Sequence, residues 1–141
     1  MASQHWLVLP VLGQVILTIV VGVFTLRARI RAVMGGETTL RKIALNNAAW
    51  PEPVRQFGNN FDNQFQVPAL FMAAVAFYLA TGLSDAVAVV IAFVFLAARI
   101  AHSIEHVTSN NVVRRMMFFL ASVAAMAALW AWFAIRFYVT G

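Results

Sequence analysis

The chain has 141 residues, of which 62% are hydrophobic and 11% are charged. An ordinary soluble domain is about 45–50% apolar and about 25% charged, so this composition argues against a soluble fold and favours a surface covered by lipid. Cysteine is absent, which excludes a disulfide framework, a cysteine metal site and a catalytic thiol of the protein itself. Any thiol chemistry must therefore come from a ligand.

Four uncharged segments follow one another along the chain. The first runs from Trp6 to Leu26, the second from Val67 to Leu83, the third from Ala86 to Ala98 and the fourth from Met116 to Ile135. In the polar stretch before the second run no glycine follows Gly58, and nothing stops the third helix at Arg99. Both helices are therefore expected to extend beyond their apolar parts to a length that spans a bilayer. The sequence predicts one domain over residues 1–141 with four membrane helices, at about 6–27, 56–81, 84–107 and 112–138.

The connections between these helices differ in length. Only Gly82 to Asp85 separates the second helix from the third, which predicts antiparallel neighbours joined by a tight turn. The first loop, over residues 29–55, is the only long one. We expect a short amphipathic helix around Leu40 to Ala49, ended by the turn Trp50-Pro51-Glu52-Pro53.

The net charge of +5 comes from ten basic and five acidic residues. These charges flank the hydrophobic runs and form no separate basic domain, so we expect no nucleic-acid partner and interpret them as signals of orientation and anion binding. The positive-inside rule then places the first and third loops in the cytoplasm and both termini outside it. Nine basic residues flank those loops, Arg27, Arg29, Arg31, Arg41, Lys42, Arg55, Arg99, Arg114 and Arg115, whereas only Arg136 lies on the opposite side.

Ionisable residues interrupt the third helix near its cytoplasmic end. Arg99, His102, Ser103 and His106 are spaced to share one helical face and are candidates to line a binding surface. The alternative is that Arg99 snorkels to the interface while headgroups hydrate the histidines. The segment His102 to His106 also matches the H-x-x-E-H pattern of inverted zinc proteases, but such a site needs a third protein ligand, and we expect no metal here.

A stripe of amides precedes the apolar part of the second helix. Its members are Gln56, Asn60, Asn63 and Gln64. Such amides either contact a ligand or bridge membrane helices by hydrogen bonds, and for any single amide the bridging role is favoured. Gln14 in the first helix is interpreted as a packing residue of this second kind.

Two arginines open the fourth helix. The helix dipole favours anions at an N-terminus, so Arg114 and Arg115 are not placed there for helix stability and are candidates to hold an anion. The alternative is a purely topological role, which we favour for Arg114.

Several local motifs match one known family. They are Arg27-Ala28-Arg29, the segment from Asn59 to Val67-Pro68, Ala98-Arg99-Ile100-Ala101-His102, and Arg115 at the start of the fourth helix. Together they cover nearly the whole chain, which resembles the MAPEG family, membrane-associated proteins in eicosanoid and glutathione metabolism. The resemblance implies a homotrimer that binds glutathione between neighbouring subunits near the cytoplasmic face, with Arg115 holding the thiolate.

The chain departs from the family pattern at ligand contacts. Gln64 and Gln66 stand where family enzymes usually carry an acidic residue, and His106 stands where a tyrosine is common. The overall pattern is most similar to the bacterial branch, which implies the bacterial inner membrane.

We therefore interpret the chain as an all-α, homotrimeric four-helix membrane protein. The leading hypothesis is a glutathione transferase or peroxidase that uses glutathione as co-substrate on hydrophobic electrophiles or lipid peroxides. The alternative is a non-catalytic module that binds a lipid or an anionic headgroup at the subunit interface. We expect the second helix to line the trimer interior through its amides and small residues. Arg115 is the predicted catalytic residue, and the predicted ligand-binding residues are Arg27, Asn60, Asn63, Gln64, Arg99, His102 and His106.

Overall fold

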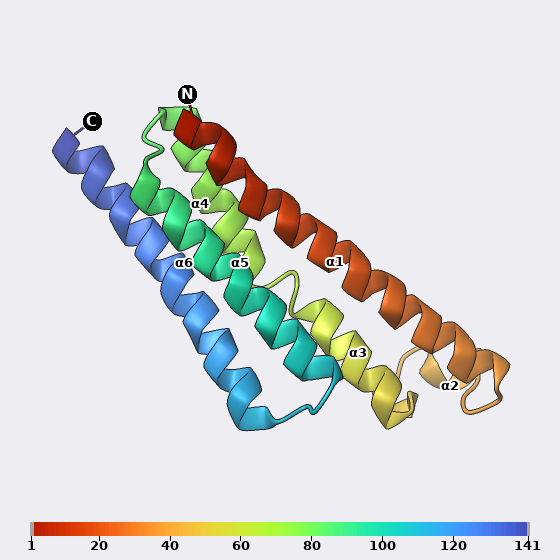
Figure 1. The fold of residues 1–141 in the computed structure, drawn as a ribbon. Helices are drawn as coiled ribbons and strands as arrows, with labels where there is room; N and C mark the ends of the chain where they lie inside the picture. The colour runs from red at the N-terminus through yellow and green to blue at the C-terminus, as the bar shows by residue number, and fades with distance from the viewer. Residues whose placement is uncertain (1, 141) are drawn as a thin grey trace.

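The computed structural model describes the backbone of residues 2–140 and the side chains of residues 4–139, and every regular element in this range is a helix. Four stretches are long and apolar enough to cross a membrane, at Gln4–Met34, Glu52–Thr81, Ala86–Val107 and Val112–Val139. The expected all-helical fold with four spans is thus confirmed. The elements are α1 (Ala2–Met34), α2 (Leu40–Ile43), the 3-10 helix η1 (Asn47–Ala49), α3 (Glu52–Asp62), α4 (Val67–Thr81), α5 (Ala86–Val107) and α6 (Val112–Thr140) (Figure 1).

Helix α1 continues seven residues beyond its expected end at residue 27, to Met34. It stops where Gly36 takes a positive φ of 75°, which a residue without Cβ adopts freely. The amide of Glu37 then donates to the carbonyl of Ala32 and the amide of Gly36 to that of Val33, the pattern of a Schellman C-cap. Charged side chains alone do not end a helix, so the predicted boundary at Arg27 marked the end of the apolar run only.

The expected continuous helix over residues 56–81 is wrong, because residues 63–66 separate α3 from α4. Pro68 lies in the first turn of α4, where it lacks an amide hydrogen and its ring would collide with the carbonyl of residue 64 in a continuous helix. The carbonyl of Asn63 is thereby free of the helical ladder and accepts a hydrogen bond from α5. In the first loop, likewise, the helix expected over residues 40–49 is two short pieces, α2 and η1.

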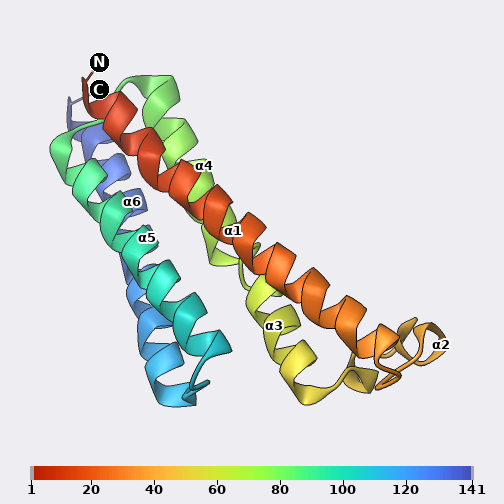
Figure 2. The same ribbon diagram turned by 45° about the vertical axis from the view of Figure 1, so that its right-hand side comes forward.

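The helices form a bundle with both termini at one end (Figure 1). Helices α3 and α4 lie end to end along α1, while α5 and α6 run side by side as an antiparallel pair (Figures 1 and 2). The α1–α3 loop and the α5–α6 loop both lie at the end opposite the termini, but apart from each other, because α1 with α3 diverges from α5 with α6 toward that end (Figure 2). We call this the loop end.

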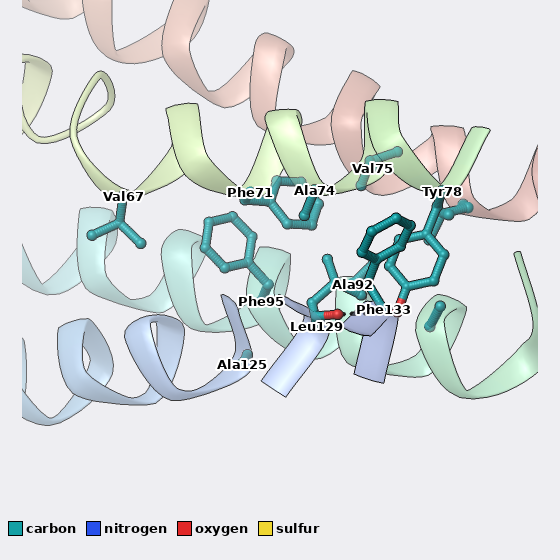
Figure 3. Close-up of a cluster of buried hydrophobic side chains, with 12 residues drawn as sticks. Val67, Phe71, Ala74, Val75, Tyr78, Ala92, Phe95, Ala125, Leu129 and Phe133 are labelled. Carbon is teal, nitrogen blue, oxygen red and sulfur yellow. Dashed lines mark hydrogen bonds between the residues drawn. The ribbon is translucent and has the colours of Figure 1, made fainter. Parts of the chain in front are cut away.

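The apolar core combines side chains from α1, α4, α5 and α6, many of which are labelled in Figure 3. The parts of these helices that carry the core lie in the half of the bundle near the termini (Figure 1). The rings of Phe71 in α4 and Phe95 in α5 stack with their centroids 4.1 Å apart. The hydroxyl of Tyr78 donates to the carbonyl of Leu129 at 3.0 Å, so α6 is tied to α4 in the same layer. Most of the buried polar side chains lie instead toward the loop end, on α3 and the second half of α5.

Large apolar side chains also cover the outside of the bundle. On α1, for example, Ile16 is 61% exposed and Ile19 is 60% exposed. Such a surface is stable only where lipid replaces water. The chain is therefore an integral membrane protein.

Asp85 fastens the α4–α5 turn to α6 and provides a test of the fold. Its carboxylate accepts from the amide of Ala88 at 2.9 Å and from Trp132 Nε1 at 3.0 Å, and it forms an ion pair with Arg136 at 3.5 Å. Because Asp85→Ala removes a helix cap and two partners together, we expect a loss of about 1–3 kcal/mol and a melting temperature several degrees lower in detergent.

The matched control for Asp85 is Thr81→Ala, since the Thr81 hydroxyl bonds only to carbonyls of its own helix. Equal melting temperatures for the two variants would show that Asp85 does not fasten the turn.

Candidate functional site

Helix α5 carries a buried polar face toward the loop end. Arg99 is 0% exposed, and His102 and His106 are 3% and 2% exposed. The expectation that these residues share one face is confirmed by their common burial. The alternative of a snorkelling Arg99 with hydrated histidines is wrong, because all three side chains are buried. Arg99 contacts the break between α3 and α4, and His102 contacts α6.

Only one of the three nitrogens of the Arg99 guanidinium group has a hydrogen-bond partner among the described residues. Its Nη2 donates to the Asn63 carbonyl at 2.7 Å, the acceptor that the helix break makes available. Its Nε and Nη1 are buried and have no hydrogen-bond partner. Among the residues that the structure describes, no acidic side chain forms an ion pair with Arg99. A buried cation without a counter-ion is costly in a membrane interior.

An amide network connects three helices beside Arg99. Gln64 Nε2 donates to Ser103 Oγ and to the Asn60 carbonyl, each at 3.0 Å, and Gln64 Oε1 accepts from Gln14 Nε2 at 3.0 Å. Asn60 Nδ2 reaches the Ser103 carbonyl at 3.4 Å. The packing role predicted for Gln14 is confirmed, and Asn60 and Gln64 bridge helices in the same way.

A pocket of about 300 Å³ lies between the helix break and the start of α6. Arg115 is half-buried in its wall, where Nη1 donates to Asn110 Oδ1 at 2.6 Å. His102 Nδ1 lies 3.0 Å from the carbonyl of Arg115 and must carry the proton, because a carbonyl only accepts. The pocket combines an amide, an imidazole and a guanidinium with an apolar wall, its lining being Asn63, His102, Val112, Arg115, Met116 and Phe119.

The two adjacent arginines of α6 have different surroundings. Arg114 points away from this pocket, with its side chain 58% exposed, and pairs with Glu105 at 3.3 Å and with Ser109 Oγ at 2.9 Å. Arg115 faces the pocket. One residue of helix turns the side chain by about 100°, which is enough to separate the two positions.

Five predicted ligand residues do not line this pocket, namely Arg27, Asn60, Gln64, Arg99 and His106. Asn60 and Arg99 are the buried side chains described above. Arg27 is exposed on α1, and Gln64 is buried in the amide network. His106 is buried one turn beyond His102, with the two ring centroids 5.6 Å apart, and its carbonyl accepts from Gln56 at 2.5 Å. Asn63, His102 and Arg115 are the predicted residues that the fold brings together there.

In this geometry the glutamate of the H-x-x-E-H pattern has partners other than the two histidines. Glu105 accepts from Ser109 and from the amide of Asn111, and it pairs with Arg114 on the loop side of α5. Within the described residues no group of three or more His, Asp or Glu side chains is placed to hold a metal ion.

The sequence analysis missed one site residue, Asn110, and the role of the backbone carbonyl of Asn63. Asn110, which holds Arg115, has a positive φ of 48°, a conformation that asparagine tolerates better than most residues. The Asn63 backbone carbonyl, which holds Arg99, became available only through the helix break. The Asn110-Asn111 pair before a predicted helix could have indicated the role of Asn110. Pro68 could have indicated the helix break that frees the carbonyl of Asn63.

The fold and the buried polar face define a multi-span α-helical membrane protein with a cationic site toward the end that carries its loops. The chain belongs to the MAPEG family, whose model matches residues 5–135. Comparison with curated proteins and with solved structures gave no match.

Proposed function

We propose that the chain is a membrane-embedded glutathione transferase or peroxidase that acts on hydrophobic electrophiles or lipid peroxides. The observation that carries the proposal is the position of Arg115, whose guanidinium stands in a pocket wall between polar groups and an apolar surface. The chain has no cysteine, so glutathione as co-substrate supplies the thiol.

The proposed chemistry requires a thiolate. A free thiol with a pKa of about 8.5 is mostly protonated at neutral pH, and lowering that pKa by about two units takes about 2.7 kcal/mol of preferential thiolate stabilisation. A partly buried guanidinium provides stabilisation of this size. Arg115 is accordingly the proposed catalytic residue, and Asn63 and His102 beside it bind the ligand.

The thiolate then reacts in one of two ways. In conjugation, its sulfur forms a bond to an electrophilic carbon, and the leaving group departs with the electron pair. With a lipid hydroperoxide, the sulfur takes the terminal oxygen and releases the alcohol, and a second glutathione converts the resulting sulfenic acid to a disulfide and water.

The test is thiol consumption by purified protein in detergent, with chlorodinitrobenzene and cumene hydroperoxide as acceptors, beside calorimetric titration of glutathione. Binding with turnover of either acceptor supports the proposal. Absence of both overturns it.

We further propose that the protein is a homotrimer in which Arg27, exposed on α1, reaches the pocket of a neighbouring subunit. Four small residues at helical spacing on α4, Ala69, Ala73, Ala76 and Ala80, are exposed or half-buried in the single chain and permit close helix packing. Native mass spectrometry in mild detergent should return a mass three times that of one chain. A monomer at every concentration would rule out a site shared between subunits.

We also propose that the loop end faces the cytoplasm of a bacterial inner membrane, as the basic residues predict. Since both termini lie at the other end (Figure 1), a reporter fused after residue 141 should be active outside the cytoplasm. Strong fluorescence of a reporter that folds only in the cytoplasm, such as green fluorescent protein, would show that the C-terminus lies in the cytoplasm and that the proposed orientation is wrong.

A second candidate function is binding of a lipid or an anionic headgroup without catalysis. It is favoured by a separate pocket of about 290 Å³ between α1, α3 and α5, whose lining is almost entirely apolar. Saturable lipid binding without thiol turnover would support it.

A further inference from the structure

The charges around the polar face of α5 do not balance. Arg99 and Arg115 are both cationic, and His102 and His106 are the other titratable groups on this face. Two acidic residues lie nearby, and neither compensates them. Glu105 is paired with Arg114, and Asp62 is exposed and lines a different pocket together with Arg29 and Arg55.

The neutral groups beside Arg99 add no negative charge. The amide oxygens of the network are neutral, and that of Gln64 is already engaged by Gln14. The buried side-chain amide oxygen that lacks a partner, Gln14 Oε1, belongs to α1 and is also uncharged. Arg99 does not line the pocket itself, but it donates to the carbonyl of Asn63, which does. An ammonium group that entered the pocket beside Asn63 would meet no carboxylate, and the charge of Arg99 would repel it.

We infer that this site selects ligands whose buried polar group is an anion, a carboxylate or a phosphate without a neighbouring ammonium group, and that Arg99 determines the selection. Arg99 has the two features that this role needs. Its side chain is fully buried, so water does not screen its charge, and two of its three nitrogens have no partner within the described chain. This inference depends on the proposed function in one respect, namely that a thiol such as glutathione is the ligand that occupies the pocket.

The test uses two matched pairs of ligands. The first pair is glutathione and glutaryl-cysteinylglycine, which is the same tripeptide without its α-amino group. The second pair is lysophosphatidate and lysophosphatidylcholine, two lipids without a thiol, of which only the second carries an ammonium group. Calorimetry on the full chain in neutral detergent should show at least tenfold tighter binding of the member without ammonium, about 1.4 kcal/mol.

Variants of Gln64 and Arg99 test whether Arg99 causes the preference for ligands without an ammonium group. Gln64→Glu introduces a carboxylate beside Ser103 and should cancel or reverse the preference. Arg99→Gln should abolish it, and Arg99→Lys, which retains the charge, should preserve it. If Gln64→Glu does not assemble, the parent and the two Arg99 variants still decide the question.

The outcomes separate this inference from the proposed function. Equal affinity for the two tripeptides would overturn the inference and leave thiol binding intact. Binding of neither tripeptide, with a preference for lysophosphatidate, would overturn the thiol proposal and support the charge inference. Absence of any preference in both pairs, as expected if a neighbouring subunit neutralises Arg99, would overturn the inference.

Discussion

With saturating glutathione, the Arg115→Ala variant should turn over at least about 100-fold more slowly than the parent, because loss of one charged donor at an anionic reaction centre costs roughly 10²–10³ in rate. The substitution removes the guanidinium group and leaves the backbone of residue 115 in place. His102 contacts the backbone carbonyl of residue 115, which the variant retains. The Arg115 side chain donates a hydrogen bond to the loop residue Asn110. Assembly and much of the ligand affinity should therefore persist.

Arg114→Ala is the matched control for that experiment. It removes the same charge from the adjacent residue, but its guanidinium is exposed and bound to Glu105 and Ser109, so turnover should stay near that of the parent. Arg27→Ala should mainly weaken ligand binding through loss of a carboxylate contact. Equal turnover in the parent and all three variants would show that the pocket does not activate a thiol, and would favour the lipid-binding alternative.

The features that could be predicted from the sequence depend on local composition. Uncharged runs identified the four spans, and basic residues beside them grouped the two loops that the fold places at one end. Helical spacing alone put Arg99, His102 and His106 on one face. Each of these inferences uses neighbours within a few turns, where hydropathy and periodicity carry the information.

The unpredicted features depend on contacts between distant segments. The burial of Arg99 depends on the helix break, which brings a carbonyl 36 positions earlier in the chain to within 2.7 Å. The orientation of Arg114 and Arg115 depends on the rotation of α6 against α5, which no local pattern specifies. Gln64 was predicted to bind a ligand, and its bridging role became visible only with α1 in place. Its ligand role stays a prediction.

Substitution of Gln64 should lower the free energy of unfolding substantially. Gln64 is 1% exposed, and Gln64→Leu keeps a similar volume. The change removes the donor to the hydroxyl of Ser103 and leaves Gln14 Nε2 with its longer hydrogen bond to Thr18 at 3.4 Å. Because an unpaired buried polar group costs about 1–3 kcal/mol, we expect a loss on the order of 2 kcal/mol or more, measured by reversible unfolding in mixed micelles. Gln66→Leu, at the exposed neighbouring glutamine, is the control and should change stability little.

A double variant distinguishes a packing role of Gln64 from a general intolerance of the site to leucine. Replacing both partners of a buried hydrogen bond by apolar groups is often close to neutral, so Gln14→Leu combined with Gln64→Leu should be more stable than Gln64→Leu alone. The two side chains meet between α1 and the end of α3, where leucines can pack against each other. A double variant that is no more stable than Gln64→Leu would show that the two amides are not coupled, and that the network does not hold α1 against the site.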